Sequence, residues 1–509
     1  MRTKLFLKNS VIILITKFLY YLSDFACRTI LIHTLPIEYV GISGLFNNIL
    51  TILSLSDLGF GTVLVYSMYV PIAQHDENKL LALVSFYKKA YRLVAIFIAT
   101  IGLCLSPFLS YLIKDCPDIP YLHVFYLLYL GNTVSSYLFT YNQSLYLADQ
   151  KMYVTSFYNN IANIIRIILQ IILLITTHNF LLYLCVQMPT TLFINYYLTK
   201  KAKRDYPFLS CQTPPSLLKE ERKKILKDVF ATFNHRVGFI SLNFTDNLLI
   251  SFFFGIVMVS KNDSYNMILT FLRNIFSPVF SALNAGIGNF HATKTPEETL
   301  KLFGTLHFAS FWFYTFCTTA FLALINPFIT LVWGKKLLFE FPVVLLISIN
   351  FFITGIRQMP ITFKESLGLL YQDRYKPLLE ALIKIVLSLI LLKQFGIIGI
   401  FIGTFISMIS TSLWVEPYVL FHYGFRTSTK QFWERNIRYI FSATIIIALT
   451  AFCVLQINLP LLPCILVRFI ICLLLPNLLL LLFYHRSEEF KELLGIVQGI
   501  IHNWKQKRN

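Results

Sequence analysis

Residues 10–34 of the chain read SVIILITKFLYYLSDFACRTILIHT, an apolar run long enough to cross a lipid bilayer as one helix. Three charged side chains interrupt this run, at Lys17, Asp24 and Arg28. Their spacing of i, i+7 and i+11 places them within about 40° of one another, which makes one charged stripe on a helix. A charged stripe on an apolar helix faces protein or water and not lipid. The stretch therefore predicts a membrane helix with one side turned toward a polar interior.

The whole chain has the composition of an integral membrane protein. Of its 509 residues, 56% are hydrophobic and only 14% are charged, whereas a soluble domain carries about 25% charged residues. A net charge of +19 would suggest nucleic acid as the partner of a soluble protein. Here the positions of the basic loops explain the charge better, and we expect no nucleic-acid partner. The nine cysteines form no Cys-x-x-Cys pair, so no metal site and no cofactor is predicted.

Apolar segments recur along the chain and predict an all-α, polytopic membrane protein with about fourteen transmembrane helices. A spanning helix needs about 20 mostly apolar residues. The predicted spans are residues 10–34, 39–66, 90–113, 120–146, 155–177, 179–199, 228–255, 263–288, 303–326, 341–364, 376–395, 397–420, 437–456 and 460–484.

The distribution of lysine and arginine predicts the orientation of these spans. About 30 of the 44 basic residues lie in the even-numbered loops and the two tails, and about five lie in the opposite loops. Because basic loops stay on the cytoplasmic side of a membrane, both termini are predicted to be cytoplasmic.

Sequence landmarks of the first half recur in the second half. Three pairs occur in one order and at nearly one spacing: Ser23-Asp24 with Thr245-Asp246, Ser106–Ser110 with Asn326–Thr330, and Gln150-x-x-Tyr153 with Gln372-x-x-Tyr375. They predict two pseudo-symmetric six-helix lobes with a substrate site between them. The predicted domains are an N-terminal lobe (1–200), a basic cytoplasmic linker (201–227), a C-terminal lobe (228–425), two extra helices, 13 and 14 (426–484), and an amphipathic cytoplasmic tail (485–509).

Nine basic residues lie inside the predicted spans, with few acids near them. They are Lys17, Arg28, Arg166, Arg236, Arg273, Arg357, Lys364, Lys384 and Arg468. Each such cation costs about 2.5–3.5 kcal/mol on insertion scales when it has no compensation. The set predicts a water-filled interior that receives an anion.

Five of these cations are the predicted substrate-binding residues: Arg28, Arg236, Arg273, Arg357 and Lys17. A guanidinium group suits a diphosphate because its planar fork donates paired, charge-assisted hydrogen bonds. Lys384 follows Glu380 at i+4 and is predicted to form a structural ion pair. Lys364 lies near a helix end, where a lysine can extend its amine to the membrane surface. The roles of Arg166 and Arg468 stay open.

Two acids in the spans are candidates for coupling transport to an ion gradient. Asp24 and Asp246 are predicted to bind a proton or Na⁺, because a carboxylate among amides can hold a small cation. Two structural alternatives remain. Asp24 can neutralise Arg28 in an i,i+4 pair, and the polar residues near Asp246 can form a seam between helices.

Four short stretches of the chain carry a resemblance to a known family. They are EYVGI (38–42), LSLSDLGFG (53–61), YVPIA (69–73) and ADQKMY (148–153). They resemble the N-terminal region of bacterial polysaccharide flippases of the multidrug/oligosaccharidyl-lipid/polysaccharide (MOP) exporter superfamily. The resemblance also covers chain length, the number of spans and the duplicated layout.

The resemblance implies two six-helix lobes around a cationic, V-shaped cavity in the bacterial inner membrane. It implies alternating access, with undecaprenyl-diphosphate-linked oligosaccharide units as cargo for O-antigen, capsule or exopolysaccharide assembly. Helices 13 and 14 would accommodate the lipid tail. Implied partners are membrane lipids, a polysaccharide polymerase and a chain-length regulator.

Three other functions are compatible with parts of the sequence. Within the same superfamily these are a cation-coupled multidrug antiporter and a lipid II flippase. A polysaccharide polymerase belongs to a different class and would require a large periplasmic loop, whereas the predicted outer loops are short. The sequence contains no Walker A motif and no acid pair suited to glycosyl transfer, so we expect no enzymatic activity.

Overall fold

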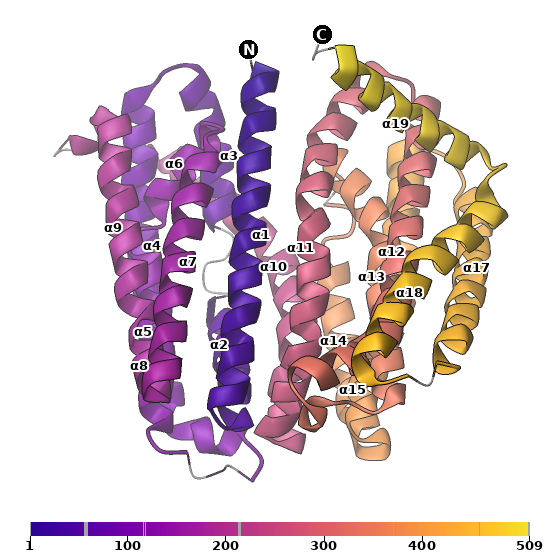
Figure 1. The fold of residues 1–509 in the computed structure, drawn as a ribbon. Helices are drawn as coiled ribbons and strands as arrows, with labels where there is room; N and C mark the ends of the chain where they lie inside the picture. The colour runs from indigo at the N-terminus through magenta and orange to yellow at the C-terminus, as the bar shows by residue number, and fades with distance from the viewer. Residues whose placement is uncertain are drawn as a thin grey trace. The chain divides into compact units, whose positions relative to one another are not determined.

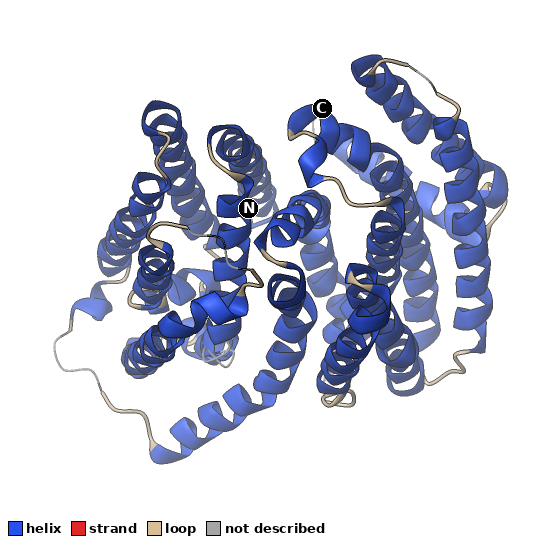
Figure 2. Cartoon of the chain, turned by 90° about the horizontal axis from the view of Figure 1, so that it is seen from below, coloured by secondary structure: helices blue, strands red, loops and turns tan. Residues whose placement is uncertain are grey.

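The computed structural model describes residues 2–54, 60–115, 117, 119–211, 215–369, 371–457 and 459–506. The chain is 88% helical, and no strand occurs in these ranges (Figure 2). The all-α prediction is therefore confirmed. By packing, the chain divides into two compact units, Met1–Asn266 and Met267–Asn509, called here the first and the second unit.

The first unit is a bundle of long and short helices. Its elements are α1 (Arg2–Thr34), α2 (Ile37–Leu53), α3 (Phe60–Ala73), α4 (Glu77–Leu105), η2 (Ser106–Leu112), α5 (Leu122–Tyr137), α6 (Tyr141–Ala148), α7 (Met152–Thr177), α8 (Phe180–Cys185), α9 (Gln187–Asp205), η3 (Pro207–Ser210), α10 (Lys219–Phe254) and the start of α11 (Ile256–Thr293). Helices α1 and α7 lie side by side along most of their length (Figure 1).

Local signals in the sequence set several helix boundaries of the first unit. The Asp76 carboxylate accepts a hydrogen bond from the Lys79 backbone N–H (2.9 Å) and caps α4. The Asn179 side chain caps α8 in the same way. Gly255 has φ +84°, a backbone angle that favours glycine, and it separates α10 from α11.

The second unit continues from α11 and contains the remaining elements. They are α12 (Pro296–Val332), η4 (Lys335–Leu337), α13 (Phe341–Ser366), α14 (Lys376–Phe395), α15 (Ile397–Ser407), η5 (Met408–Ser412), α16 (Leu413–Val419), η6 (Leu420–Phe425), α17 (Lys430–Leu455), α18 (Leu461–Tyr484) and α19 (Glu488–Gln506). Aromatic side chains from α12, α13, η6 and α17 form its core around Phe303, Phe363 and Phe421.

Two features of the second unit position the residues described below. Thr295 and Glu298 form a capping box at the start of α12, with Pro296 at the first helical position. Residues 397–425 run as one continuous helix in which η5 and η6 are π-helical segments. Glu416 and Pro417 lie between these two segments, and such local widening is often found at functional positions.

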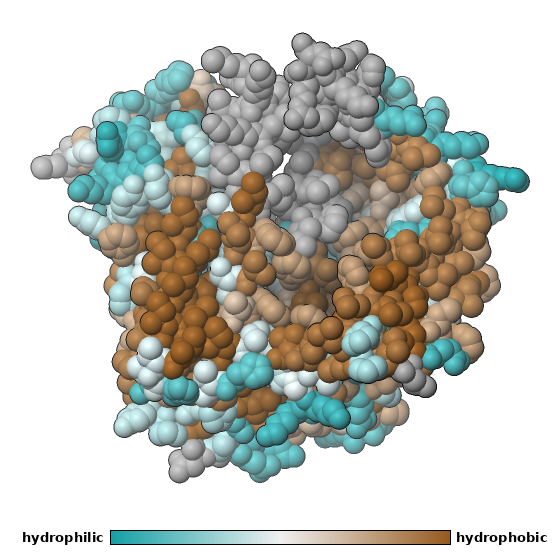
Figure 3. Space-filling view, viewed as in Figure 1, coloured by the Kyte–Doolittle hydropathy of each residue, from teal (hydrophilic) through white to brown (hydrophobic). Residues whose placement is uncertain are grey.

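In the part of the chain that the structure describes, seven helices or helical runs are long and apolar enough to cross a membrane: Glu77–Leu112, Met152–Thr177, Pro296–Val332, Phe341–Ser366, Ile397–Phe425, Lys430–Leu455 and Leu461–Tyr484. Shorter apolar helices occur at Ile37–Leu53, Val63–Ala73 and Phe244–Phe254. On α7, exposed isoleucines such as Ile165 and Ile172 cover the middle of the helix. The corresponding surface is brown in Figure 3, with hydrophilic residues at both ends.

Several boundaries differ from the sequence-based predictions. The predicted span 39–66 is divided between α2 and α3. The predicted linker 201–227 is largely helical, because α9 continues to Asp205 and α10 begins at Lys219. The division between the compact units falls at 266/267, since α10 packs against α2 within the first unit. The predicted duplication of two lobes remains a prediction.

Candidate functional site

The charged stripe of α1 lies beside α7, which contributes Arg166. Asp24 is half-buried, and both Arg28 and Arg166 act electrostatically on its carboxylate. Neither arginine forms an ion pair with Asp24, so the structural alternative of an i,i+4 pair between Asp24 and Arg28 is wrong. Arg166 and Asp24 have no hydrogen bond or ion pair with any described residue. Arg166 Nε is also buried.

Arg28 pairs instead with Asp263 at the start of α11. Arg28 Nη1 lies 3.4 Å from Asp263 Oδ2, and Arg28 Nη2 donates to Ser264 Oγ at 3.5 Å. Asn247 of α10 donates to Asp263 Oδ1 (2.8 Å), and Asn262 donates to Asn247 Oδ1 (2.6 Å). Asp263 therefore has a second hydrogen-bond donor besides Arg28. We call Asp24, Arg28, Arg166, Asn247 and Asp263 the polar cluster of the first unit.

The other predicted site residues of the first unit lie outside this network. Lys17 is half-buried and has no ion pair among the described residues. Asp246 is half-buried on α10, one residue before Asn247. Arg236 also lies on α10, but its side chain is outside the described residues.

The second unit contains a buried ion network centred on Arg357 of α13. Arg357 Nε and Nη2 donate to the two oxygens of Glu416 at 3.1 and 2.9 Å. Arg357 Nη1 donates to Glu380 Oε1 of α14 at 3.1 Å. This geometry is a bidentate Arg–carboxylate pair with a second acid on the remaining nitrogen. Arg357 is thus occupied by carboxylates, and its predicted role as an anion-binding residue is not supported by this geometry.

Further charged groups complete the network around Glu380 and Glu416. Lys376 contacts Glu416 and lies 3.8 Å from Glu380, and Ser412 of η5 donates to Glu380. Both glutamate side chains are about 1% exposed. Lys384, which was predicted to pair with Glu380, is fully buried on the same helix.

Lys364 is the second residue of this unit, after Arg357, whose surroundings differ from the sequence-based expectation. A lysine near this helix end can extend its amine to the membrane surface, but only 3% of Lys364 is exposed. Its amine forms an ion pair with Asp373, which is equally buried. The lysine does not need to reach water, because a carboxylate lies beside it.

Arg273 of α11 has a different environment. Its guanidinium carbon lies 5.8 Å from the centre of the Phe351 ring, a cation–π contact. Its Nε is buried without a hydrogen-bond partner, and no carboxylate among the described residues forms an ion pair with it. Arg468 of α18 likewise has a buried Nε without a partner.

Several residues of these networks were not identified from the sequence. Glu416 lies inside the predicted span 397–420, and an acid at this depth is itself a signal for a buried partner. Asp263 gave a weaker signal, since it lies at the start of a polar span. Asp373 falls in a loop, where the sequence alone does not reveal that it is buried.

Neither a protein-family model nor a curated protein matches the sequence. Solved structures do match the fold. A structure of the lipid II flippase MurJ in an inward closed conformation has a TM-score of 0.68 and 14% identity, over 92% of this chain and 99% of that chain. A multidrug resistance MATE family transporter of the MOP superfamily, in an inward-facing conformation, has a TM-score of 0.61 and 16% identity, over 79% and 94%.

A third match is a MOP superfamily transporter from Pyrococcus furiosus, described as having a binding pocket of reverse polarity. It has a TM-score of 0.54 and 14% identity, over 83% of this chain and 96% of that chain. Identities this low establish the fold and leave the cargo open. The chain therefore has the fold of the MOP superfamily transporters and flippases, an all-α architecture with about fourteen membrane helices.

Proposed function

We propose that the chain is an inner-membrane flippase that moves an anionic lipid-linked oligosaccharide across the bilayer by alternating access. The proposed cargo is an undecaprenyl-diphosphate-linked unit for surface polysaccharide, with membrane lipids, a polymerase and a chain-length regulator as partners. The proposal includes no enzymatic step.

The environment of Arg273 is the observation that carries this proposal. A guanidinium group in a membrane helix is costly unless an anion neutralises it. Arg273 has an aromatic ring beside it and no carboxylate partner in the described part of the chain. A diphosphate brings negative charge and several acceptor oxygens, which match the donors of a guanidinium group.

Cationic side chains of the first unit support the same chemistry, although one of them, Arg28, already has a carboxylate partner. Arg166 and Lys17 have no ion pair among the described residues, and Arg28 shares Asp263 with Asn247. Lys17, Arg28, Arg166 and Arg273 are the residues of the proposed substrate-binding group, and Arg236 is added to this group on the basis of the sequence. Arg357 is left out because two carboxylates occupy it.

Coupling to a proton or Na⁺ gradient through Asp24 or Asp246 belongs to the proposal. Asp24 forms no ion pair with a described residue, although Arg28 and Arg166 act on it electrostatically. Its carboxylate is therefore not occupied by a cationic side chain. Removal of the charge by Asp24→Asn should reduce transport that is driven by the ion gradient.

The extent of the structural matches favours a lipid-linked cargo over a soluble drug. The MurJ structure aligns with 92% of this chain, and the MATE transporter aligns with 79%. The same observation makes lipid II the second candidate cargo. A drug antiporter is the third candidate function, because the multidrug resistance transporter has the same fold.

Complementation in bacteria tests the proposal. The chain should restore surface polysaccharide in a strain that lacks its own O-antigen flippase, measured as the length distribution of lipopolysaccharide on gels. Arg273→Ala should abolish this activity. The matched control is Arg92→Ala, which removes an exposed arginine from α4.

Two outcomes would assign one of the other candidate functions, and a third would remove the structural argument. Restored growth of a strain depleted of its lipid II flippase, without restored polysaccharide, would assign lipid II as cargo. Dye resistance alone would assign a drug antiporter. Full activity of Arg273→Ala would remove the argument from unpaired positive charge.

A further inference from the structure

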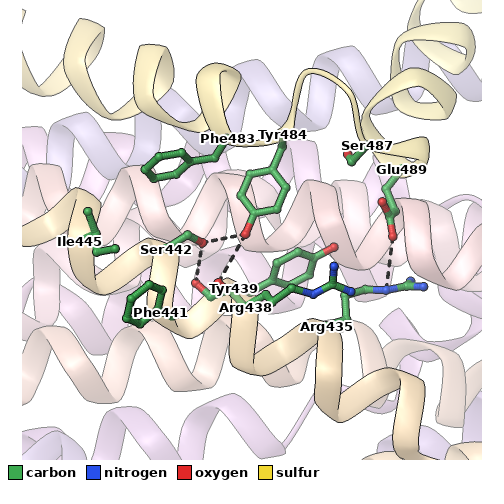
Figure 4. Close-up of a pocket in the computed structure, with 10 residues that line it drawn as sticks. All are labelled: Arg435, Arg438, Tyr439, Phe441, Ser442, Ile445, Phe483, Tyr484, Ser487 and Glu489. Atoms are coloured by element: carbon green, nitrogen blue, oxygen red, sulfur yellow. Dashed lines mark hydrogen bonds and ion pairs between the residues drawn. The ribbon is translucent and has the colours of Figure 1, made fainter.

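A second cationic site lies at the end of the second unit where α17 begins and α18 ends. A cavity of about 390 Å³ is lined there by residues of α17, by the end of α18 and by the start of α19 (Figure 4). Arg435 and Arg438 supply positive charge on one side, and Glu489 lies across from Arg435. No residue of this cavity belongs to the proposed substrate-binding group.

The two arginines differ in whether a carboxylate of the protein already binds the guanidinium group. Arg435 Nε lies 3.3 Å from Glu489 Oε1, so this guanidinium already binds a carboxylate of α19. Arg438 Nε donates only to the Glu434 carbonyl of its own helix, at 3.3 Å. In the described ranges no carboxylate forms an ion pair with Arg438. The cavity therefore has two cations against one anion, and one of its guanidinium groups is available.

Hydroxyl groups form the polar wall of the cavity beside these arginines. Ser442 Oγ and the Tyr484 hydroxyl share a hydrogen bond of 2.7 Å, and the Ser442 hydroxyl also donates to the Tyr439 carbonyl. Both hydroxyl protons are thus used within the protein, so the donors that remain for a phosphate oxygen are those of the arginine side chains.

Apolar side chains line the other side of the cavity. Phe441 of α17 is 68% exposed and Phe483 of α18 is 48% exposed, and both line the cavity on the side opposite Glu489 (Figure 4). From there, exposed residues such as Phe452 and Leu478 continue along the same two apolar helices, which are long enough to cross a membrane. A free phosphate ion gains nothing from contact with this apolar surface, whereas a lipid buries its acyl chains against it.

We propose that this cavity binds the phosphate headgroup of an anionic phospholipid from the surrounding leaflet. The phosphate lies against Arg438 and Arg435, and the acyl chains follow the exposed faces of α17 and α18. Glu489 competes with the phosphate for Arg435, so the lipid and the start of α19 occupy the same guanidinium in turn. The distribution of basic loops predicts that this end of α17 is cytoplasmic, and the cytoplasmic leaflet is rich in anionic lipids.

Lipid binding to the purified full-length protein tests this site. Fluorescent phosphatidylglycerol should bind more tightly than phosphatidylcholine, and Arg438→Ala should weaken phosphatidylglycerol binding about fivefold, the effect of losing one basic residue at a membrane surface. Arg438 is exposed, so the variant should fold normally, as judged by size-exclusion chromatography. Arg92→Ala is the matched control and should bind like the unmodified protein.

Two further measurements identify the ligand and the competition. Glu489→Gln should bind phosphatidylglycerol more tightly, because the competing carboxylate is lost. Equal affinity of Arg438→Ala and the unmodified protein would overturn the proposal. Binding of inorganic phosphate that depends on Arg438 would overturn the lipid assignment, and weaker binding by Glu489→Gln would contradict the competition.

Discussion

Arg357 in the second unit and Arg28 in the first unit are both arginines within apolar segments, but their surroundings differ. Arg357 makes three hydrogen bonds of 2.9–3.1 Å to two glutamates that are about 1% exposed. Arg28 makes longer contacts of 3.4 and 3.5 Å, and the side chains of Arg28 and Asp263 are 16% and 21% exposed. The polar cluster of the first unit also contains Arg166, which has no ion pair with any residue that the structure describes.

This difference shows that a cation in a membrane span has two possible roles. Where carboxylates surround it at short range, its charge is used to hold helices together, as α13, α14 and α16 are held through Arg357. Where partners are shared or absent, the charge remains available to a ligand. The comparison therefore predicts that variants of the buried ion network lower stability and that variants of the polar cluster lower transport.

The largest effect is expected from Arg357→Ala. The substitution leaves Glu380 and Glu416 buried with less compensation, and breaking such a pair costs about 3–5 kcal/mol. Thermal unfolding of the detergent-solubilised protein should show a large drop in midpoint. The double variant with Arg357→Met and Glu416→Gln should recover part of the loss, because it also removes one of the orphaned acids. A single variant as stable as the unmodified protein would contradict the structural role of the network.

A smaller effect is expected from Gly44→Ala in α2. A Cβ at this position would lie 2.3 Å from Asp263 Oδ2, so the carboxylate that contacts Arg28 must move. Overpacking of this kind costs about 1–3 kcal/mol. The control is Gly286→Ala in α11, where no atom lies within 4 Å of the added Cβ. If both variants unfold at the same temperature, Gly44 does not lie against the Asp263 carboxylate.

Arg28→Ala should change stability least among the charge substitutions. Its pair with Asp263 is partly exposed and long, and such pairs contribute about 1 kcal/mol or less. Transport in the complementation assay should nevertheless fall strongly, because a predicted substrate-binding residue is removed. A stability loss as large as that of Arg357→Ala, measured in the same unfolding experiment, would erase the distinction between the two regions.

The smallest effect is a pH dependence of α19, the C-terminal helix. Burial alone would raise the pKa of Glu492, but hydrogen bonds from Lys301 and Thr305 outweigh it and hold the pKa below its ordinary value. A carboxylate with a lowered folded-state pKa stabilises the folded contact above its unfolded pKa and loses that contribution as the pH falls through the folded pKa. The contact of α19 with α12 should thus be constant near neutral pH and weaken in acid, below about pH 4.

Hydrogen exchange of residues 488–496 across this pH range measures the effect. Glu492→Gln should exchange faster than the unmodified protein at neutral pH and show a weaker dependence on acid. Identical exchange profiles of the two proteins would show that Glu492 does not attach α19 to α12.

Apolar runs and their lengths were sufficient to predict an all-α membrane protein with about fourteen spans, because a bilayer requires helices of a defined length. Every predicted span lies on helices of the structure, although the spans 39–66, 120–146 and 179–199 are each divided between two helices. The placement of cations within spans was also readable from the sequence, since charge in an apolar segment is conspicuous. Asp24 and Arg28 both lie on α1, but the i,i+4 pair that their spacing suggested is not formed, and Arg28 pairs with Asp263 instead.

Only the tertiary structure decided which cations are neutralised. Glu416 and Arg357 are separated by 59 positions, and Asp263 and Arg28 by 235. Ion pairing depends on distances of a few ångströms between side chains from different helices, and helical periodicity fixes only the face on which each residue lies. The sequence thus determined where positive charge enters the membrane, and the packing of helices determined whether that charge binds a carboxylate of the protein or remains available to a ligand.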